Sequence, residues 1–253
     1  MINSVAIDCV NKKMKASELL TYKKHRPFNY PSRSWKYYQE WNDALFLHWE
    51  VDCKLVESLI PNGLELDIIN GKTWVSLVAF DMNNIGIRSL PKLPHISDFH
   101  EINIRVYVSY KGKPSVYFLS MEGSKRSSCK VLKTISKFPY RYSKMKRTAF
   151  SYTSKNKKYS DAFYAEYRLE NNPVIKDETD VWLTERYAVF QDNKNDIIEY
   201  DVHHAPWPIE AINIKKLDVN YPRFNHLIHN QPHKIHYSKG VQVLAWDKKR
   251  FTQ

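Results

Sequence analysis

Short apolar runs separated by turn residues follow one another along most of the chain from Leu45 onward. Several runs alternate apolar and polar residues and others are apolar throughout, which is typical of half-buried and fully buried β-strands respectively. Turn chemistry such as Asn70-Gly71 separates many of them, and short connections of this kind favour antiparallel pairing. The expected strands are 45–51, 73–82, 102–110, 113–121, 162–169, 180–190, 196–204 and 240–246.

Two segments carry helical spacing instead. Leu55, Leu59 and Ile60 share one face of a predicted helix that Pro61 ends. Residues 127–137 place apolar side chains on one face and lysines on the opposite face, which is typical of an amphipathic helix lying on a core. Because both helices are short and the strands are many, the predicted fold class is mainly β with a few helices.

The N-terminal part has a different texture from the rest. Residues 1–41 are rich in lysine and arginine, contain few strong apolar positions and include Pro27 and Pro31, which interrupt a helix. We predict a basic arm or short helix there. No internal repeat or low-complexity linker divides the remainder, so residues 42–253 are predicted to form a single antiparallel β-barrel-like domain.

Composition indicates a folded protein and argues against several classes. Hydrophobic residues make up 43% of the 253 residues and charged residues 26%, which argues against wholesale disorder. Only 6 glycines are present, which does not suit a glycine-rich nucleotide-binding design. The 3 scattered cysteines predict neither a disulfide framework nor a zinc knuckle and fit a reducing cytoplasm. No apolar run approaches the roughly 18 residues of a membrane span, so membrane insertion is not expected.

Seven segments, taken in order, are more specific than composition. They are FLHWEVD, LIPNGLELDIINGKTWVSLVAFDM, FHEINIRVYV, FPYRYSKM, WLTERY, HHAPWP and HYSKGVQVLAW. Over roughly residues 42–250 the chain resembles the YqjF-like family of uncharacterised conserved proteins. The resemblance implies an acetoacetate decarboxylase-like fold, an antiparallel β-barrel with a central cavity large enough for a small molecule. It implies no activity, because fold analogy alone does not carry chemistry.

The turn at residues 138–141 departs from the decarboxylases that this fold resembles. In those enzymes a Pro-Lys-Lys turn supplies a Schiff-base lysine whose pKa is lowered by the neighbouring lysine. Here Tyr140 and Arg141 follow the proline, and neither side chain can form an imine. We therefore expect no Schiff base and no cofactor, with Tyr140 and Arg141 lining the pocket instead. Lys137 and Lys144 flank the turn and are the alternative sources of an amine.

The predicted strand that begins near residue 101 has one polar face. Glu101, Asn103, Arg105 and Tyr107 alternate with apolar residues and therefore point to the same side. This face is either exposed to water or directed into the barrel. The resemblance favours the barrel, because the related decarboxylases carry a cavity glutamate that aligns with Glu101. We therefore expect Glu101 to transfer a proton and Arg105 to hold a carboxylate, with Asn103 and Tyr107 beside them.

Two further side chains are candidates for binding a ligand. Arg186, on the expected strand 180–190, could clamp a carboxylate with its two parallel N–H groups. The alternative is a cross-strand ion pair with an acidic neighbour such as Glu199. His48 lies between two apolar residues, where a histidine is either a structural residue or part of the pocket wall. Trp207, held between two prolines, is a pocket wall or a plug.

The C-terminal histidines invite a metal interpretation that their context does not support. Four of them are spaced three or four residues apart, namely His226, His229, His233 and His236. Pro232 interrupts the segment, and no glutamate or cysteine completes a known ligand set. We predict no metal site.

A stretch without any acidic residue runs from Lys125 to Lys158 and contains twelve basic residues, which equals the net charge of +12. Aromatic residues are interleaved with these charges and could stack on bases; they are Tyr140, Tyr142, Phe150 and Tyr152. A basic surface that binds nucleic acid or anionic lipid is therefore the alternative function. Its affinity would fall steeply with salt.

The main prediction is a cytoplasmic protein that binds a small organic acid in a barrel cavity. It is either a binding protein or a cofactor-independent, lyase-type enzyme without the Schiff-base lysine, and the residues do not decide between binding and turnover. Exposed sheet edges also allow a homodimer.

Overall fold

The computed structural model describes residues 13–90, 96–193 and 196–252. Its elements, in chain order, are α2 (Ala16–Leu19), β1 (Tyr37–Val51), α3 (Cys53–Glu57), β2 (Glu65–Leu66), β3 (Thr73–Ile87), β4 (Phe99–Tyr110), β5 (Lys113–Gly123), α4 (Arg126–Ser136), β6 (Tyr140–Tyr142), β7 (Lys144–Thr148), β8 (Ser151–Asn156), β9 (Asp161–Pro173), α5 (Glu178–Thr184), β10 (Ala188–Asn193), β11 (Asp196–His203), β12 (Glu210–Asn220), β13 (Lys234–Ala245) and β14 (Lys249–Thr252).

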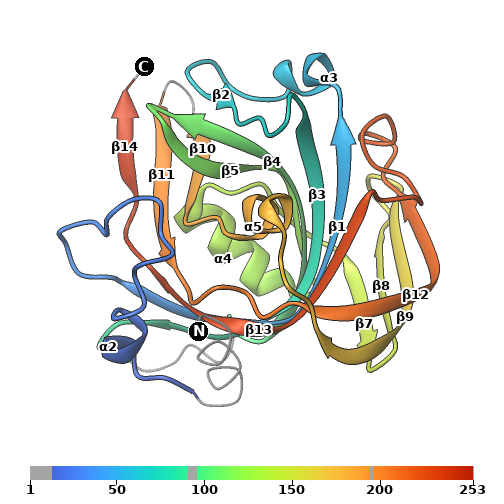
Figure 1. Ribbon diagram of the computed structural model, residues 1–253, viewed down its shortest axis with the longest axis horizontal. Coiled ribbons are helices and arrows are strands. Elements are labelled where there is room, and N and C mark those ends of the chain that lie inside the picture. Colours follow the sequence, from blue (N-terminus) through green and yellow to red (C-terminus); the bar gives the residue numbers. More distant parts are fainter. Residues whose placement is uncertain (1–12, 91–95, 194–195, 253) are drawn as a thin grey trace.

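The strands of this described part form one sheet that closes into a ring. Along the ring the order is β11, β10, β5, β4, β3, β1 and β13, and pairing of β11 with β13 completes it. Figure 1 looks into this ring, with α4 and α5 inside its outline. Most pairings are antiparallel, but β10 and β6 pair with β5 in parallel. The predicted β-barrel-like fold is therefore confirmed as a mostly β, ring-like structure whose sheet is mixed.

Four strands continue the sheet beyond the ring as an outer layer, which we define as β12, β9, β8 and β7 (Figure 1). Because residues on a strand alternate between its two faces, β4 turns Ile104 and Val106 outward. There they share one core with Tyr152 and Phe163 of the outer layer. The opposite side chains of the ring strands form a second core inside the ring. The ring strands are therefore packed against a hydrophobic core on each of their two faces.

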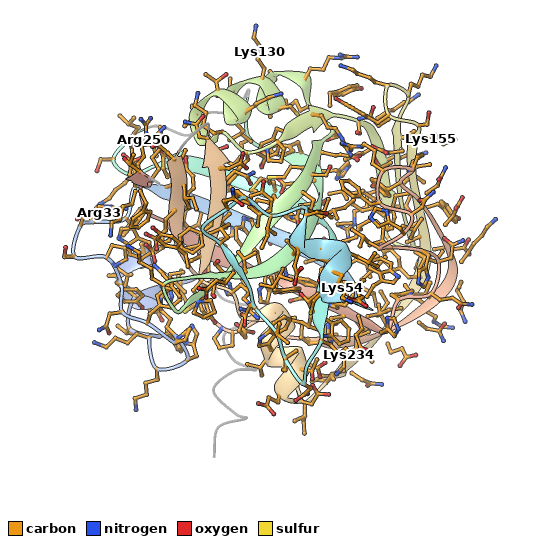
Figure 2. All side chains as sticks on the ribbon, turned by 90° about the horizontal axis from the view of Figure 1, so that it is seen from above. Arg33, Lys54, Lys130, Lys155, Lys234 and Arg250 are labelled. Carbon is orange, nitrogen blue, oxygen red and sulfur yellow. The ribbon has the colours of Figure 1, made fainter. Side chains whose placement is uncertain are left out.

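Two helices close opposite ends of the ring. Figure 2, turned by 90°, shows α4 with Lys130 at one end of the molecule and α5, beside Lys234, at the other. Lys234 marks the α5 end because its ammonium group binds Asp177 and Asp180 at the start of that helix, at 2.6 Å each. The interior of the ring is thus divided between an α4 end and an α5 end.

Helix α5 replaces part of the strand that we predicted at 180–190. A capping box starts the helix, because the Asp177 side chain accepts from the backbone of Asp180 while the Asp180 side chain accepts from the backbone of Asp177. The Val-Trp-Leu-Thr sequence favours a strand, but the cap and the packing inside the ring outweigh this local preference. The predicted strand was therefore wrong up to residue 187, and β10 begins at Ala188.

The predictions for α4 and for the Asn70-Gly71 turn agree with the structure, whereas the start of the sheet and several strands differ from the prediction. Helix α4 forms over nearly the predicted residues and is capped by Lys137, which has a left-handed backbone two residues before Pro139. Asn70 and Gly71 both have positive φ, as a tight turn requires. The sheet begins at Tyr37, inside the predicted arm, and strands β6, β7, β8 and β12 were not expected. Strand β6 has only three residues, and β7, β8 and β12 belong to the outer layer, which has a solvent-facing side, so all four carry little hydrophobic periodicity.

The part of the arm that the structure describes lies against the ring. Leu19 of α2 is buried with Trp246, whose indole N–H donates to the Arg33 carbonyl at 2.7 Å. The Tyr30 ring stacks on Trp246 with centroids 5.6 Å apart. The first twelve residues of the predicted arm, with Cys9, lie outside the described residues. Among the described helices none is long and apolar enough to cross a membrane.

Candidate functional site

A cavity of about 180 Å³ lies inside the ring. Strands β1, β3, β4, β5, β10, β11 and β13 contribute its walls, and α4 covers it with Val131, Leu132 and Ile135. Most lining side chains are aliphatic or aromatic. The polar lining residues are Gln39, Glu101, Asn103, Arg105 and Ser136, together with the hydroxyl of Tyr140.

The polar face of β4 points into this cavity. Glu101 and Asn103 are 1% and 4% exposed, and Arg105 is half-buried beside them. The alternating pattern predicted that these residues share a face, and the resemblance indicated which way the face points. Polar groups in such a place keep little contact with water, so their partners inside the protein determine their chemistry.

Glu101 is held by two neighbours. The Tyr140 hydroxyl donates to Glu101 Oε2 at 2.6 Å, and the Asn103 side chain also hydrogen-bonds to the carboxyl group. Burial raises the pKa of Glu101 from 4.5 to about 7, and these two hydrogen bonds oppose part of that rise. At neutral pH the carboxyl group is therefore close to half protonated and can either donate or accept a proton.

Arg105 supplies positive charge without a carboxylate partner. One of its terminal nitrogens donates to the Leu183 carbonyl of α5 at 3.3 Å, and its guanidinium lies 5.7 Å from the centre of the Phe46 ring. Within the described ranges no acidic side chain forms a salt bridge with it, and its Nε has no hydrogen-bond partner. Asn103 Oδ1, on the same face, is also buried and unpartnered. The cavity therefore contains a guanidinium group, that of Arg105, with no carboxylate bound to it among the described residues.

Tyr107 and His48, which we predicted to bind ligand, do not line the cavity. The Tyr107 hydroxyl donates to the Leu183 carbonyl at 2.9 Å and contacts Ser76 Oγ at 2.7 Å. His48 lies on the other side of Ser76, at 2.6 Å, and its second ring nitrogen is 3.0 Å from His236. Burial lowers the pKa of His48 well below its usual value, so this histidine is neutral. These groups are hydrogen-bonded to one another and to the Leu183 carbonyl under α5.

Arg186 has two partners inside the protein. It forms an ion pair with Asp67 and donates from Nε to the Trp182 carbonyl at 2.7 Å. Among the described residues the alternative pair with Glu199 is not present, because Arg186 follows the end of a helix and folds back over it instead of lying on the predicted strand. Its Nη2 is buried without a hydrogen-bond partner, and the carboxylate clamp stays a prediction.

Arg141 faces away from the cavity although Tyr140, one residue earlier, lines it. Strand β6 alternates, so the two side chains lie on opposite faces. Arg141 binds Glu122 and Asp161 at 2.7 Å each, between the ring and the outer layer. We predicted Arg141 as a pocket residue because its position in the turn matches that of a lysine in the decarboxylases. In the structure the alternation of β6 directs its side chain away from the cavity.

No lysine lines the cavity among the residues that the structure describes. Lys137 and Lys144, the two alternative amines, are both exposed. Tyr140 lines the cavity and donates to Glu101. The expectation that this chain forms no Schiff base stays a prediction.

The basic stretch 125–158 does not form a uniformly exposed basic surface in the structure. Arg147 is buried and pairs with Asp81 at 3.2 Å, so its charge is not free on the surface. Tyr140 and Tyr152 are buried in the two cores, whereas Phe150 is 68% exposed. Two of the four aromatic residues proposed to stack on bases therefore cannot do so.

Several wall residues were missed by the sequence analysis. Tyr37, Gln39 and Trp41 line the cavity from the start of β1. Their spacing of two residues was the available signal, but the basic neighbourhood led us to assign them to the arm. Trp207, predicted as a wall or a plug, is a wall residue packed edge-on against Phe46 with ring centroids 5.0 Å apart.

Comparison with known sequences gives the family. The sequence profile of DUF2071, described as an uncharacterized conserved protein, matches residues 38–242. The chain belongs to the DUF2071 family. The uncharacterized protein YqjF of Bacillus subtilis (strain 168) is 37% identical over 232 residues, which cover 88% of this chain and 95% of YqjF. The predicted YqjF-like resemblance is thus confirmed.

Solved structures share the fold at low identity. Acetoacetate decarboxylase from Legionella pneumophila has a TM-score of 0.60 at 14% identity, covering 95% of this DUF2071 chain and 97% of the enzyme. An acetoacetate decarboxylase-like enzyme from Sphingomonas wittichii has a TM-score of 0.57 at 12% identity, covering 90% and 98%. The enduracididine biosynthesis enzyme MppR in complex with pyruvate has a TM-score of 0.57 at 9% identity, covering 90% and 93%. These likenesses establish an acetoacetate decarboxylase-like fold and no activity.

Proposed function

We propose that this DUF2071 protein binds a small organic acid in the cavity of the ring and transfers a proton to or from it. The observation that carries the proposal is the pairing, on one buried face of β4, of a guanidinium without an anion and a carboxyl group that titrates near neutrality. Arg105 is the first of these groups and Glu101 the second. A cavity with a few convergent polar groups and a perturbed pKa is the usual form of a ligand site.

Arg105 holds the carboxylate of the acid through charge-assisted hydrogen bonds. The unpartnered Nε of Arg105 and Oδ1 of Asn103 are the groups left for the ligand. The same fold accommodates an organic acid in MppR, which has been solved with pyruvate bound. MppR has also been solved with the condensation product of pyruvate and imidazole 4-carboxaldehyde, which supports the proposed class of ligand.

Glu101 is the proton-transfer group. In its neutral form it donates a proton to a developing carbanion or enolate of the ligand, and in its ionised form it removes a proton from the carbon next to a carbonyl group. Tyr140 and Asn103 orient it, since both hydrogen-bond to its carboxyl group. No lysine is among the described residues that line the cavity, so in the proposed lyase-type reaction the carbonyl group of the substrate itself accepts the electron pair.

Proton exchange at carbon tests binding and chemistry separately. The purified protein is mixed in D₂O with oxo acids of four to ten carbons whose ketone lies at successive positions along the chain. Titration calorimetry measures their binding, and proton NMR follows loss of the hydrogens next to the ketone. Removing the charge-assisted bond in Arg105→Ala should weaken binding by about ten- to hundredfold. Glu101→Gln should leave affinity within a few fold and abolish the exchange.

The matched control is Arg168→Ala, because Arg168 is an exposed arginine on β9, outside the cavity. It should change neither binding nor exchange. If Arg105→Ala binds the acids as well as the wild type does, the proposed carboxylate site is wrong. If Glu101→Gln still exchanges the hydrogens at the wild-type rate, the proposed role of Glu101 is wrong.

A further inference from the structure

The cavity contains much more apolar wall than a short acid can use. Outside the polar face of β4, several polar groups of the lining residues already have partners inside the protein. Gln39 Oε1 accepts from the Trp41 indole at 2.8 Å, and Ser136 Oγ donates to the Leu132 carbonyl at 2.7 Å. The Tyr200 hydroxyl donates to the Ser136 carbonyl at 3.2 Å. Most of the remaining lining side chains are aliphatic or aromatic, so this part of the wall offers a ligand mainly apolar contact.

Aromatic rings shape this apolar part. Trp41 stacks on Trp207 with centroids 6.1 Å apart, and Trp207 meets Phe46 edge-on. Phe80 lies 6.0 Å from Trp41. Flat and edge surfaces of this kind pack well against rings and alkyl chains.

Strand register separates the polar end from the apolar end. Arg105 pairs with Ser76 on β3, near the α5 end, whereas Tyr37 pairs with Ile87 and with Ala245 at the opposite end of those strands. A carboxylate bound at Arg105 therefore leaves the apolar space toward α4 for the rest of the molecule. Glu101 lies four residues before Arg105, about 13 Å along an extended strand, which favours a carbon skeleton that runs along β4.

The volume sets the size of the ligand. An apolar protein cavity of about 150 Å³ is large enough to hold benzene. The present cavity of about 180 Å³ also contains polar groups at one end, so it suits one ring or a comparable alkyl chain attached to a carboxylate.

We propose that the ligand of this site is a monocarboxylic acid with an apolar body of about six to ten carbons, alkyl or aryl, rather than a two- or three-carbon acid. This inference rests on the proposed function, because Arg105 holds the carboxylate. The apolar body lies between the aromatic wall of β1 and β3 and the inner face of α4. Ala245, the smallest lining side chain, determines how much of the far end is open.

A chain-length series tests the inference with the wild-type protein. Titration calorimetry compares acetate, pyruvate, butyrate, hexanoate, octanoate and phenylacetate, with hexanamide as the uncharged analogue. Each added methylene should tighten binding about three- to fourfold until the cavity is full. Hexanamide should bind at least about tenfold more weakly than hexanoate, because it lacks the charge that Arg105 binds.

Ala245→Leu narrows the far end without touching the polar face of β4. It should weaken octanoate and phenylacetate by tenfold or more and leave acetate and pyruvate unchanged. If all acids bind equally, the inference about the apolar body is wrong while the proposed acid site stands. If no acid binds, or hexanamide binds as well as hexanoate, the proposed function fails as well. The wild-type series decides between these results even if Ala245→Leu does not fold.

Discussion

Burial of Glu101 makes the stability of the protein depend on pH in a way that one substitution removes. The folded state holds this carboxyl group with a pKa of about 7, against 4.5 for the group in the unfolded chain. Between these values the folded protein binds one more proton than the unfolded chain does. The free energy of unfolding therefore falls as pH rises through this window, and the stabilisation that is fully present below pH 4.5 is lost above about pH 7.

The magnitude follows from linkage. A pKa that moves from 4.5 to about 7 corresponds to about 3 kcal/mol, of which about 2.5 kcal/mol is lost between about pH 5 and pH 8. Glu101→Gln has the same shape and cannot titrate, so it lacks this loss. Urea unfolding of both proteins should show the wild type losing about 2.5 kcal/mol relative to the variant over that interval.

The comparison cancels the titration of all other groups, since both proteins carry them. Tyr140→Phe removes a hydrogen bond that lowers the pKa of Glu101, so it should move the pH-dependent loss to higher pH. A difference between wild type and Glu101→Gln that stays constant from about pH 5 to pH 8 would refute the reasoning. It would mean that water reaches the carboxyl group and that the cavity is wetter than its walls indicate.

Gly240→Ala should lower the free energy of unfolding by about 2 kcal/mol or more, as measured by urea unfolding. Gly240 has a φ of 134°, and an added Cβ would clash with the carbonyl oxygen of Trp41. Iodoacetamide at pH 8 should label Cys53 well before Cys129, because burial raises the pKa of the Cys129 thiol to about 11. Peptide mass spectrometry measures the labelling, and equal labelling of both cysteines would contradict the burial of Cys129 on α4. Charge reversal at three exposed lysines, Lys155, Lys157 and Lys158, should leave the affinity for hexanoate unchanged in calorimetry. A loss of affinity in this variant would place the ligand on the basic surface.

The fold was predictable where a strand has two distinct faces. On β4 the alternation of polar and apolar residues predicted the strand and the shared face of Glu101, Asn103 and Arg105, which line the cavity, whereas Tyr107 on the same strand does not. Residues 180–187 show the limit, because a capping box and a place inside the ring outweigh a strand-like composition. Arg186 was assigned to the wrong environment for that reason.

The remaining errors concern partners that are distant in sequence. His48 lies among apolar residues, and nothing near it indicates that Ser76 and His236 satisfy both of its ring nitrogens. The ion pairs of Arg141 are likewise formed by Glu122 and Asp161, which belong to other strands. Local patterns predict which face a residue occupies, but only the assembled sheet shows whether its polar groups are already satisfied.

The ring has a consequence for how the protein is made. Strand β1 forms one of its long pairings with β13, nearly two hundred residues later in the chain, and β13 also completes the ring through β11. On a ribosome, the first strands must therefore wait, with an apolar face exposed, until almost the whole chain has emerged. The cavity walls, and with them the proposed acid site, therefore come together only when β13 has joined both β1 and β11.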